Sequence, residues 1–231
     1  MFSFRDKKGD VASSQGVPMM PLREVVVFPH TPMSLIVGRP KSVAAVHRAN
    51  ATDKRIFLVA QKSGDRIDPR SDDIYQVGTV ARIEQTLHLP DGNMKILVEG
   101  ESRARIVRYL DNPACFDVEL DVLEPDEPDV ETQALVRTVR STFERFVKLN
   151  KAVPPEMVLS VNTQESADRL ADMLVSVLQF KLGERQELLE EVDVGARLER
   201  IYKALLTEIE FLQVEKKLKH RVKRERESTQ R

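Results

Sequence analysis

The sequence contains no tryptophan, only one cysteine and no long apolar run. With Cys115 alone, no disulfide can form within the chain, which favours a reducing compartment. No window approaches the roughly 18 consecutive apolar residues that a membrane-spanning helix needs. The polar start of the chain carries no secretory signal pattern. These absences predict a cytoplasmic protein that makes no membrane contact.

The sequence also lacks the common catalytic and metal-binding motifs. It has no G-x-x-x-x-G-K-[ST] phosphate loop, no G-x-S-x-G nucleophile turn and no H-E-x-x-H zinc motif. The four histidines are scattered, and the single cysteine completes no recognisable spacing of metal ligands. We therefore predict no catalytic residue, no metal site and no cofactor in this chain.

What the sequence does contain is enough apolar and charged material for a folded protein. Of its 231 residues, 41% are apolar and 32% are charged, which supports a core beneath a well-solvated surface. The formal net charge is only −1, yet residues 214–231 carry eight Lys or Arg against three Glu. This basic tail leaves open a weak contact with DNA or another polyanion, although such a run more often forms a solvated helix face.

Residues 17–124 have the pattern of a β-rich domain. Asp91-Gly92 lies between two apolar runs of strand type, and this dipeptide is a strong hairpin signal because the turn needs positive φ. Residues 116–123 alternate apolar and acidic side chains, as a strand half-buried on an antiparallel sheet does. Further runs of strand length and composition lie at 25–28, 34–37 and 55–60.

One helix is expected inside this domain. Pro40 and Ser42 provide a start signal, and Val43, Val46 and Ala49 follow at near-helical spacing. The sequence therefore predicts a closed or curled, mostly antiparallel β domain with one helix, preceded by a flexible leader at residues 1–16.

From residue 131 to the end the apolar period is that of helices, after a linker at 125–130 that is rich in proline and acidic residues. The last helix is expected at about 194–226, with Asp193 as its N-cap. Its apolar stripe gives way to charge near the end, which suggests that the helix projects from the body of the protein toward a partner. The stripe consists of Leu198, Ile201, Leu205, Ile209 and Leu212.

Two stretches carry a specific resemblance to a known family. MPLREVVVFPHTPMSLIVGRPKSVAAVHRA and the later QVGTVARIEQTLHLPDGNMKILVEGESRARIVRY resemble successive signatures of the amino-terminal region of Lon family ATP-dependent proteases. The helical half also fits, so the resemblance covers nearly all of residues 18–231. It implies an α+β fold, with a PUA-like β pseudobarrel followed by a helical bundle that ends in a long projecting helix.

The resemblance also implies what is missing. Lon family members continue from this region into an AAA+ motor and a protease domain with a Ser-Lys dyad, and the chain contains neither set of motifs. We therefore expect an amino-terminal fragment that is not itself an enzyme. ATP and Mg would bind the absent motor.

Family members use this region to capture unfolded or degron-bearing proteins and to help hold the homo-oligomer, a hexamer in the full-length family. A capture surface needs exposed apolar residues on a rigid frame. The proline-bounded link FPHTPM and the hairpin tip are the expected positions, although Phe28 and Met33 could instead plug the mouth of the barrel. The candidate client-contact residues are Phe28, Pro29, Pro32, Met33, Leu87 and Leu89.

The terminal helix is the candidate for contact between subunits. Five apolar residues suffice merely to pack against the preceding helices, so the first three of the stripe are expected in the core. Ile209 and Leu212 are the predicted inter-subunit contacts.

Two other functions remain open at the level of the sequence. One is a nucleic-acid-binding PUA-like module that uses the basic tail, although only twelve aromatic residues are present to stack on bases. The other is a small-ligand binder, against which the absence of tryptophan argues, since aromatic cages use it.

Overall fold

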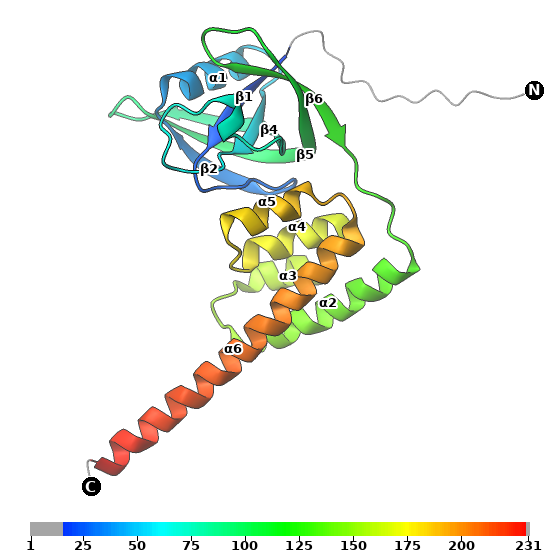
Figure 1. Ribbon diagram of the computed structural model, residues 1–231. Coiled ribbons are helices and arrows are strands. Elements are labelled where there is room, and N and C mark those ends of the chain that lie inside the picture. The colour runs from blue at the N-terminus through cyan, green and yellow to red at the C-terminus, as the bar shows by residue number, and fades with distance from the viewer. Residues whose placement is uncertain (1–15, 230–231) are drawn as a thin grey trace, which may run out of the picture.

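The computed structural model describes residues 16–229 of the chain, and side chains as far as residue 222. A β domain lies on one side and a helical half on the other, and the last helix runs away from both (Figure 1). The predicted leader lies, except for Gly16, outside the described residues. The strands are β1 (Val17–Leu22), β2 (Pro32–Val37), β3 (Arg55–Ala60), β4 (Val77–His88), β5 (Met94–Leu110) and β6 (Phe116–Leu123).

These strands form one mixed six-stranded sheet in the order β2-β5-β4-β3-β1-β6, which curls because β5 also pairs with β6. β5 is 17 residues long, so its first part pairs with β2 and its last part with β6. Register shifts in the β4–β5 and β5–β6 ladders bend these strands, as β-bulges do. The β1–β3 pair is parallel and the others are antiparallel, so the expected pseudobarrel within an α+β fold is confirmed.

The first strand is not where the sequence pattern predicted it. Residues 25–28 are irregular, and β1 precedes them as VPMMPL. Its two prolines made this segment an improbable strand, since proline cannot donate to a β ladder. Each proline, however, lies where β1 has a partner on one side only: Pro18 opposes β6, and Pro21 opposes β3.

Six helices complete the fold. Asp193 caps α6 as predicted, with Oδ1 accepting from the backbone N–H of Gly195 at 2.8 Å. Gly183 lies within α5 rather than at a helix end, and α4 has already ended before it. The helices are α1 (Pro40–Ala51), α2 (Val130–Leu149), α3 (Pro155–Thr163), α4 (Ala167–Val177), α5 (Leu182–Glu190) and α6 (Val194–Thr229), with a 3-10 turn at Ser71–Asp73.

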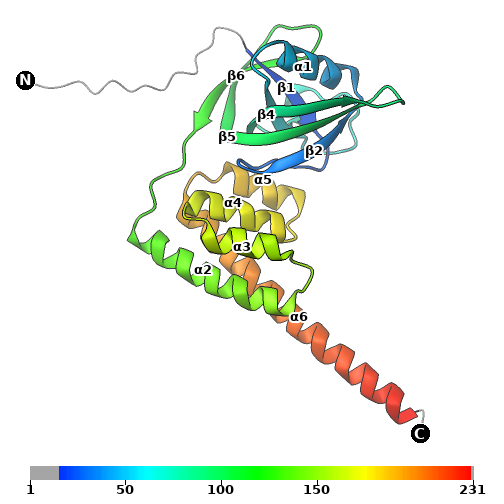
Figure 2. The ribbon, with the colours of Figure 1, turned by 180° about the vertical axis from the view of Figure 1, so that it is seen from behind.

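The β domain has two apolar clusters of its own, one between α1 and the sheet and one inside the curled sheet. The helical half has a third cluster built from α2 to α6. Seen from behind, α6 crosses the bundle beside α2 and then continues without a neighbour (Figure 2). The third cluster also takes in four residues of the β domain, so the two halves share one core: Val26, Phe28, Ala60 and Val77.

Candidate functional site: protein-binding surfaces

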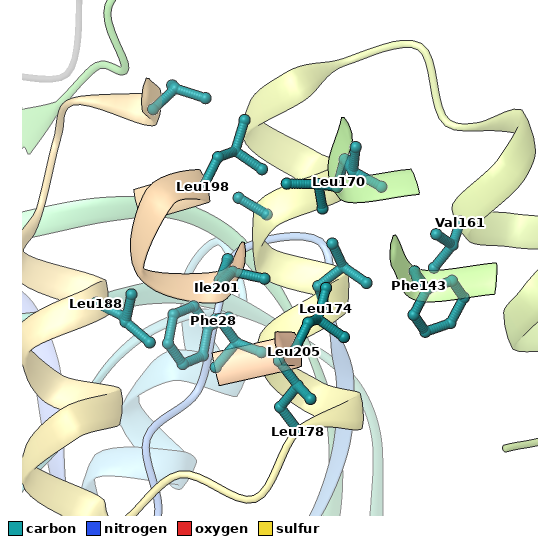
Figure 3. Packing of buried hydrophobic residues seen from close by; sticks show 14 of the residues in the cluster. Phe28, Phe143, Val161, Leu170, Leu174, Leu178, Leu188, Leu198, Ile201 and Leu205 are labelled. Atoms are coloured by element: carbon teal, nitrogen blue, oxygen red, sulfur yellow. The ribbon is translucent and has the colours of Figure 1, made fainter. Parts of the chain in front are cut away.

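Phe28 lies in the junction between the two halves. Its side chain is 5% exposed and packs among Leu188, Ile201 and Leu205 of the helical core (Figure 3). The backbone that follows Phe28 is hydrogen-bonded to β5, because the N–H of His30 donates to the carbonyl of Gly100 at 2.8 Å. The expectation that Phe28 offers an exposed surface to clients is therefore corrected, since the helical half covers it.

Next to Phe28, four charged side chains join the halves. Arg103 of β5 and Arg197 of α6 both bind Asp172 of α4, with Arg197 Nη1 at 2.8 Å and Arg103 Nη1 at 3.0 Å from its two oxygens. Arg197 Nη2 also donates to Asp168 at 2.5 Å. Arg103 Nε donates to the carbonyl of Leu189 at 3.1 Å, and the Arg103 guanidinium lies over the Phe28 ring.

The two arginines and the two aspartates balance in charge, and three of the four side chains are almost fully buried. Burial raises the pKa of Asp172, and the two neighbouring guanidinium groups oppose that rise by favouring the charged carboxylate. A buried ion pair keeps its geometry, because separating the two groups would leave an unpaired charge buried away from water. The cluster therefore fixes the β domain on the helical half.

The other predicted client-contact residues lie in different environments. Pro29 is buried beside Phe28, so the expectation of exposure is corrected for it as well. Met33 is half-buried against the core of the β domain, whereas Pro32 is exposed. Leu87 is 56% exposed near the end of β4. Leu89 is half-buried in the hairpin.

Leu87 belongs to an exposed face that sequence reasoning missed. Ile36 of β2 opposes Lys95 of β5, which in turn opposes Leu87 of β4, so the three lie in one row across the sheet. Side chains in such a row point to the same face. Ile36 is 63% exposed, and Leu97 lies half-buried in the next row toward the domain. We call these four residues the ribbon face: Ile36, Leu87, Lys95 and Leu97.

The predicted inter-subunit contacts are also displaced. Ile209 is 3% exposed and belongs to the helical core, and Leu212 is half-buried against that core. The expectation that Ile209 faces another subunit is therefore corrected. Beyond it, α6 exposes a second apolar row whose members are three or four residues apart and so share one side of the helix. We call this row the outer stripe: Phe211, Val214, Leu218 and Val222.

The remaining chemistry-bearing groups give no further site. Among the described side chains of residues 16–222, no group of three or more His, Cys, Asp and Glu could hold a metal ion. Cys115 is buried, and its burial raises the pKa of its thiol. None of the helices described in this range is long and apolar enough to cross a membrane.

A rigid two-part α+β body that exposes apolar surface on a sheet face and on a projecting helix defines a protein-binding domain. The chain belongs to the Lon protease family, because the model of the ATP-dependent protease La (LON) substrate-binding domain matches residues 16–207. It is thus a Lon-type substrate-binding amino-terminal domain, and the resemblance inferred from the signature stretches is confirmed.

Similar curated proteins support the same family assignment. The chain is 47% identical over 215 residues to the Lon protease of Azospirillum brasilense, covering 93% of this chain and 26% of that protein. It is 45% identical over 216 residues to the Lon protease of Escherichia coli strain K12, covering 93% and 28%. The chain therefore spans little more than a quarter of the length of these relatives. None of these comparisons supports a nucleic-acid-binding module.

Two solved structures share the fold. The N-terminal domain of a Mycobacterium avium complex Lon protease superposes with a TM-score of 0.70 at 23% identity, covering 83% of this chain and 98% of that one. The Lon N-terminal domain protein from Xanthomonas campestris gives 0.57 at 22% identity, covering 80% and 96%. At these identities the two structures establish the α+β fold and its chain order.

Proposed function

We propose that the ribbon face is where this domain captures unfolded or degron-bearing proteins. Unfolded chains expose apolar segments that native proteins hide, and apolar surface removed from water on contact stabilises the complex. The single observation that carries the proposal is the row Ile36–Lys95–Leu87, which leaves two large aliphatic side chains exposed on either side of Lys95 on a paired sheet.

Two features of the ribbon face suit varied clients. Three hydrogen-bonded strands hold its backbone, so a client need not order it on binding, which lowers the entropic cost. The single Lys95 at its centre also favours segments that carry a carboxylate beside their apolar residues.

We also propose that the outer stripe of α6 holds neighbouring copies of the chain together. Four exposed apolar residues at helical spacing form a seam that a second helix can cover. In the longer, cytoplasmic protein, such pairing would support the homo-oligomer, and captured clients would pass to a motor that binds ATP and Mg and to a protease part.

Client capture is tested by binding of the 231-residue chain to one labelled protein, in native form and in permanently unfolded form. The I36S/L87S double variant should bind the unfolded form about tenfold more weakly, since it removes two exposed apolar contacts. Its thermal unfolding should not change, because both side chains are exposed.

The matched control is V107S. It also replaces an exposed aliphatic residue, but one on the part of β5 away from the ribbon face. V107S should bind like the unsubstituted chain. Equal weakening by V107S, or equal binding of the native and unfolded forms, would refute capture by the ribbon face.

A further inference from the structure

A groove of about 490 Å³ runs beside the ribbon face, between β1, β2 and the start of α1. Its lining includes the consecutive residues Met20–Leu22 of β1 and Ser34–Val37 of β2. Successive side chains of a strand point to opposite faces of the sheet. A groove lined by consecutive residues therefore runs along the edges of these strands rather than over one face.

Along the stretch that lines the groove, each strand has a partner on one side only among the described strands, β3 for β1 and β5 for β2. Within the described part of the chain, β2 pairs only with β5, and β1 pairs with β6 only as far as Met19. Alternate residues of an edge strand turn their N–H and C=O groups away from its neighbour. The edge of β2 is thus able to accept another strand.

The register shows which backbone groups of β2 are free. Pro32 opposes Glu99, so Thr31 opposes Gly100, and the Gly100 N–H donates to the Thr31 carbonyl at 3.3 Å. Every second residue from Thr31, namely Met33, Leu35 and Val37, therefore turns its backbone groups toward β5. The residues between them, Ser34 and Ile36, turn theirs away from β5. Pro32 shares this phase, and an edge position facing away from the neighbour is where a strand tolerates proline.

The end of the groove next to α1 is positively charged. Arg23 and Arg39 line it, no carboxylate lies among its lining residues, and neither arginine has an ion-pair partner among the described side chains. Burial lowers the pKa of Arg39, the charge of Arg23 lowers it further, and the charge of Asp68 opposes this to a smaller extent. The Arg39 guanidinium donates its hydrogen bonds to other residues of the chain, including Gln61 Oε1 at 2.6 Å. It therefore contributes positive charge to the groove rather than a hydrogen bond to a ligand.

The N-terminus of α1 adds to this positive end. No side chain caps it, and its first turn contains no acidic residue. Ser42 is 4% exposed, lines the groove and makes no side-chain hydrogen bond with the described residues. Uncapped N–H groups and a positive dipole end favour a carboxylate at this position.

We propose that this groove takes the apolar carboxy-terminal segment of a client, which adds to β2 as an extra strand and places its terminal carboxylate between Arg23, Ser42 and the start of α1. This inference rests on the proposed client capture and specifies the form in which a client is held. The added strand uses backbone hydrogen bonds, which every sequence can supply, and the carboxylate sets its position along the groove. Six residues of β2 match a bound segment of about five residues.

The test uses the whole chain and a synthetic nonapeptide whose last five residues are Val, Ile and Leu and whose carboxyl terminus is free. The free acid should bind about tenfold more tightly than the same peptide with a terminal amide, as expected for one charge-assisted hydrogen bond. R23Q should remove most of this difference. The matched R105Q, at an exposed arginine of β5 outside the groove, should preserve it.

Amide hydrogen exchange measured by NMR provides the structural readout. Bound peptide should slow exchange at Ser34 and Ile36 and leave Leu35, which already bonds to β5, unchanged. A peptide N-methylated at alternate residues should lose this protection without any change to the protein. Unchanged exchange at both positions would overturn the groove assignment.

Two further outcomes separate this inference from the proposed function. An amidated peptide with an internal aspartate that binds as tightly as the free acid would overturn the assignment of the chain terminus. If the chain binds unfolded protein but not the nonapeptide, capture by the ribbon face stands and the groove assignment fails. If it binds neither, both fail.

Discussion

The β domain and the helical half are stabilised in different ways. The β domain closes two cores of its own within a curled sheet. The core of the helical half instead reaches across the junction and includes Phe28, and its buried Asp172 needs Arg103 from the other half. The helical half therefore depends on the β domain more than the β domain depends on it.

This difference explains where exposed apolar surface lies. The ribbon face stays exposed at the margin of a domain whose cores are complete without it. The outer stripe stays exposed where α6 has left the core that buries Ile209. Both surfaces can be changed at little cost to folding, whereas residues at the junction cannot.

The largest effect is expected from D172A, which should break the dependence of one half on the other. It leaves Arg103 and Arg197 buried without their shared carboxylate, and such a loss costs about 3–5 kcal/mol of unfolding free energy. Urea unfolding followed by amide exchange should show the helices opening before the sheet. The control E119Q removes the exposed Arg108–Glu119 pair and should cost under about 1 kcal/mol.

An effect of similar size is expected from F28A, which removes the apolar part of the junction. Truncating a buried phenylalanine costs about 3–5 kcal/mol through lost burial and the cavity left behind. Chemical denaturation measures this loss, and the increase in exchange should centre on α5 and α6. If F28A were as stable as the exposed L87A control, Phe28 would not contribute to the shared core.

The outer stripe should affect association rather than stability. F211S/L218S should lower self-association of the chain, measured by sedimentation at increasing concentration, while its denaturation midpoint stays unchanged, because both side chains are exposed. The control is K203S on the exposed side of the anchored part of α6. Unaltered sedimentation of the double variant would refute pairing through the stripe.

The smallest effect is expected at the start of α2. Asp129 Oδ1 accepts from the Thr132 N–H at 2.8 Å, and this hydrogen bond lowers the pKa of Asp129 below its ordinary value of 3.8. Because the folded-state pKa is depressed, the capping contribution is present above the ordinary value and is lost as pH falls through the lowered one. D129A should thus reduce Tm slightly at neutral pH and not at strongly acidic pH. If D129A lowered Tm by the same amount at neutral and at strongly acidic pH, the ionised Asp129 carboxylate would not be the cause of the change.

The sequence predicted the elements whose patterns are local. The Asp91-Gly92 hairpin, the Asp193 cap and the helical stripe through Leu205 all follow from spacing and turn chemistry within a few residues. The β1 strand was missed because its prolines are tolerated only through one-sided pairing, which depends on distant partners.

The site was harder to predict than the fold, for a physical reason. Ile36 lies in the continuous apolar run Leu35–Val37, so periodicity could not show which side chain faces water. No local pattern shows that Arg103 is buried, because its partner Asp172 is 69 residues away in the sequence. Phe28 was a candidate either for an exposed client contact or for a plug at the mouth of the barrel, because nothing local reveals that a helical bundle covers it.

The length of α6 has a mechanical consequence. The helix is anchored as far as Ile209, and the 20 residues beyond extend about 30 Å. A tilt of about 10° at the anchor would therefore move the far end by about 5 Å, as with a lever. Arg197 of this helix shares Asp172 with Arg103 of the sheet, so a tilt of the helix acts directly on the junction between the two halves. A small rotation at the junction would therefore become a displacement of several ångströms at the tip of the helix.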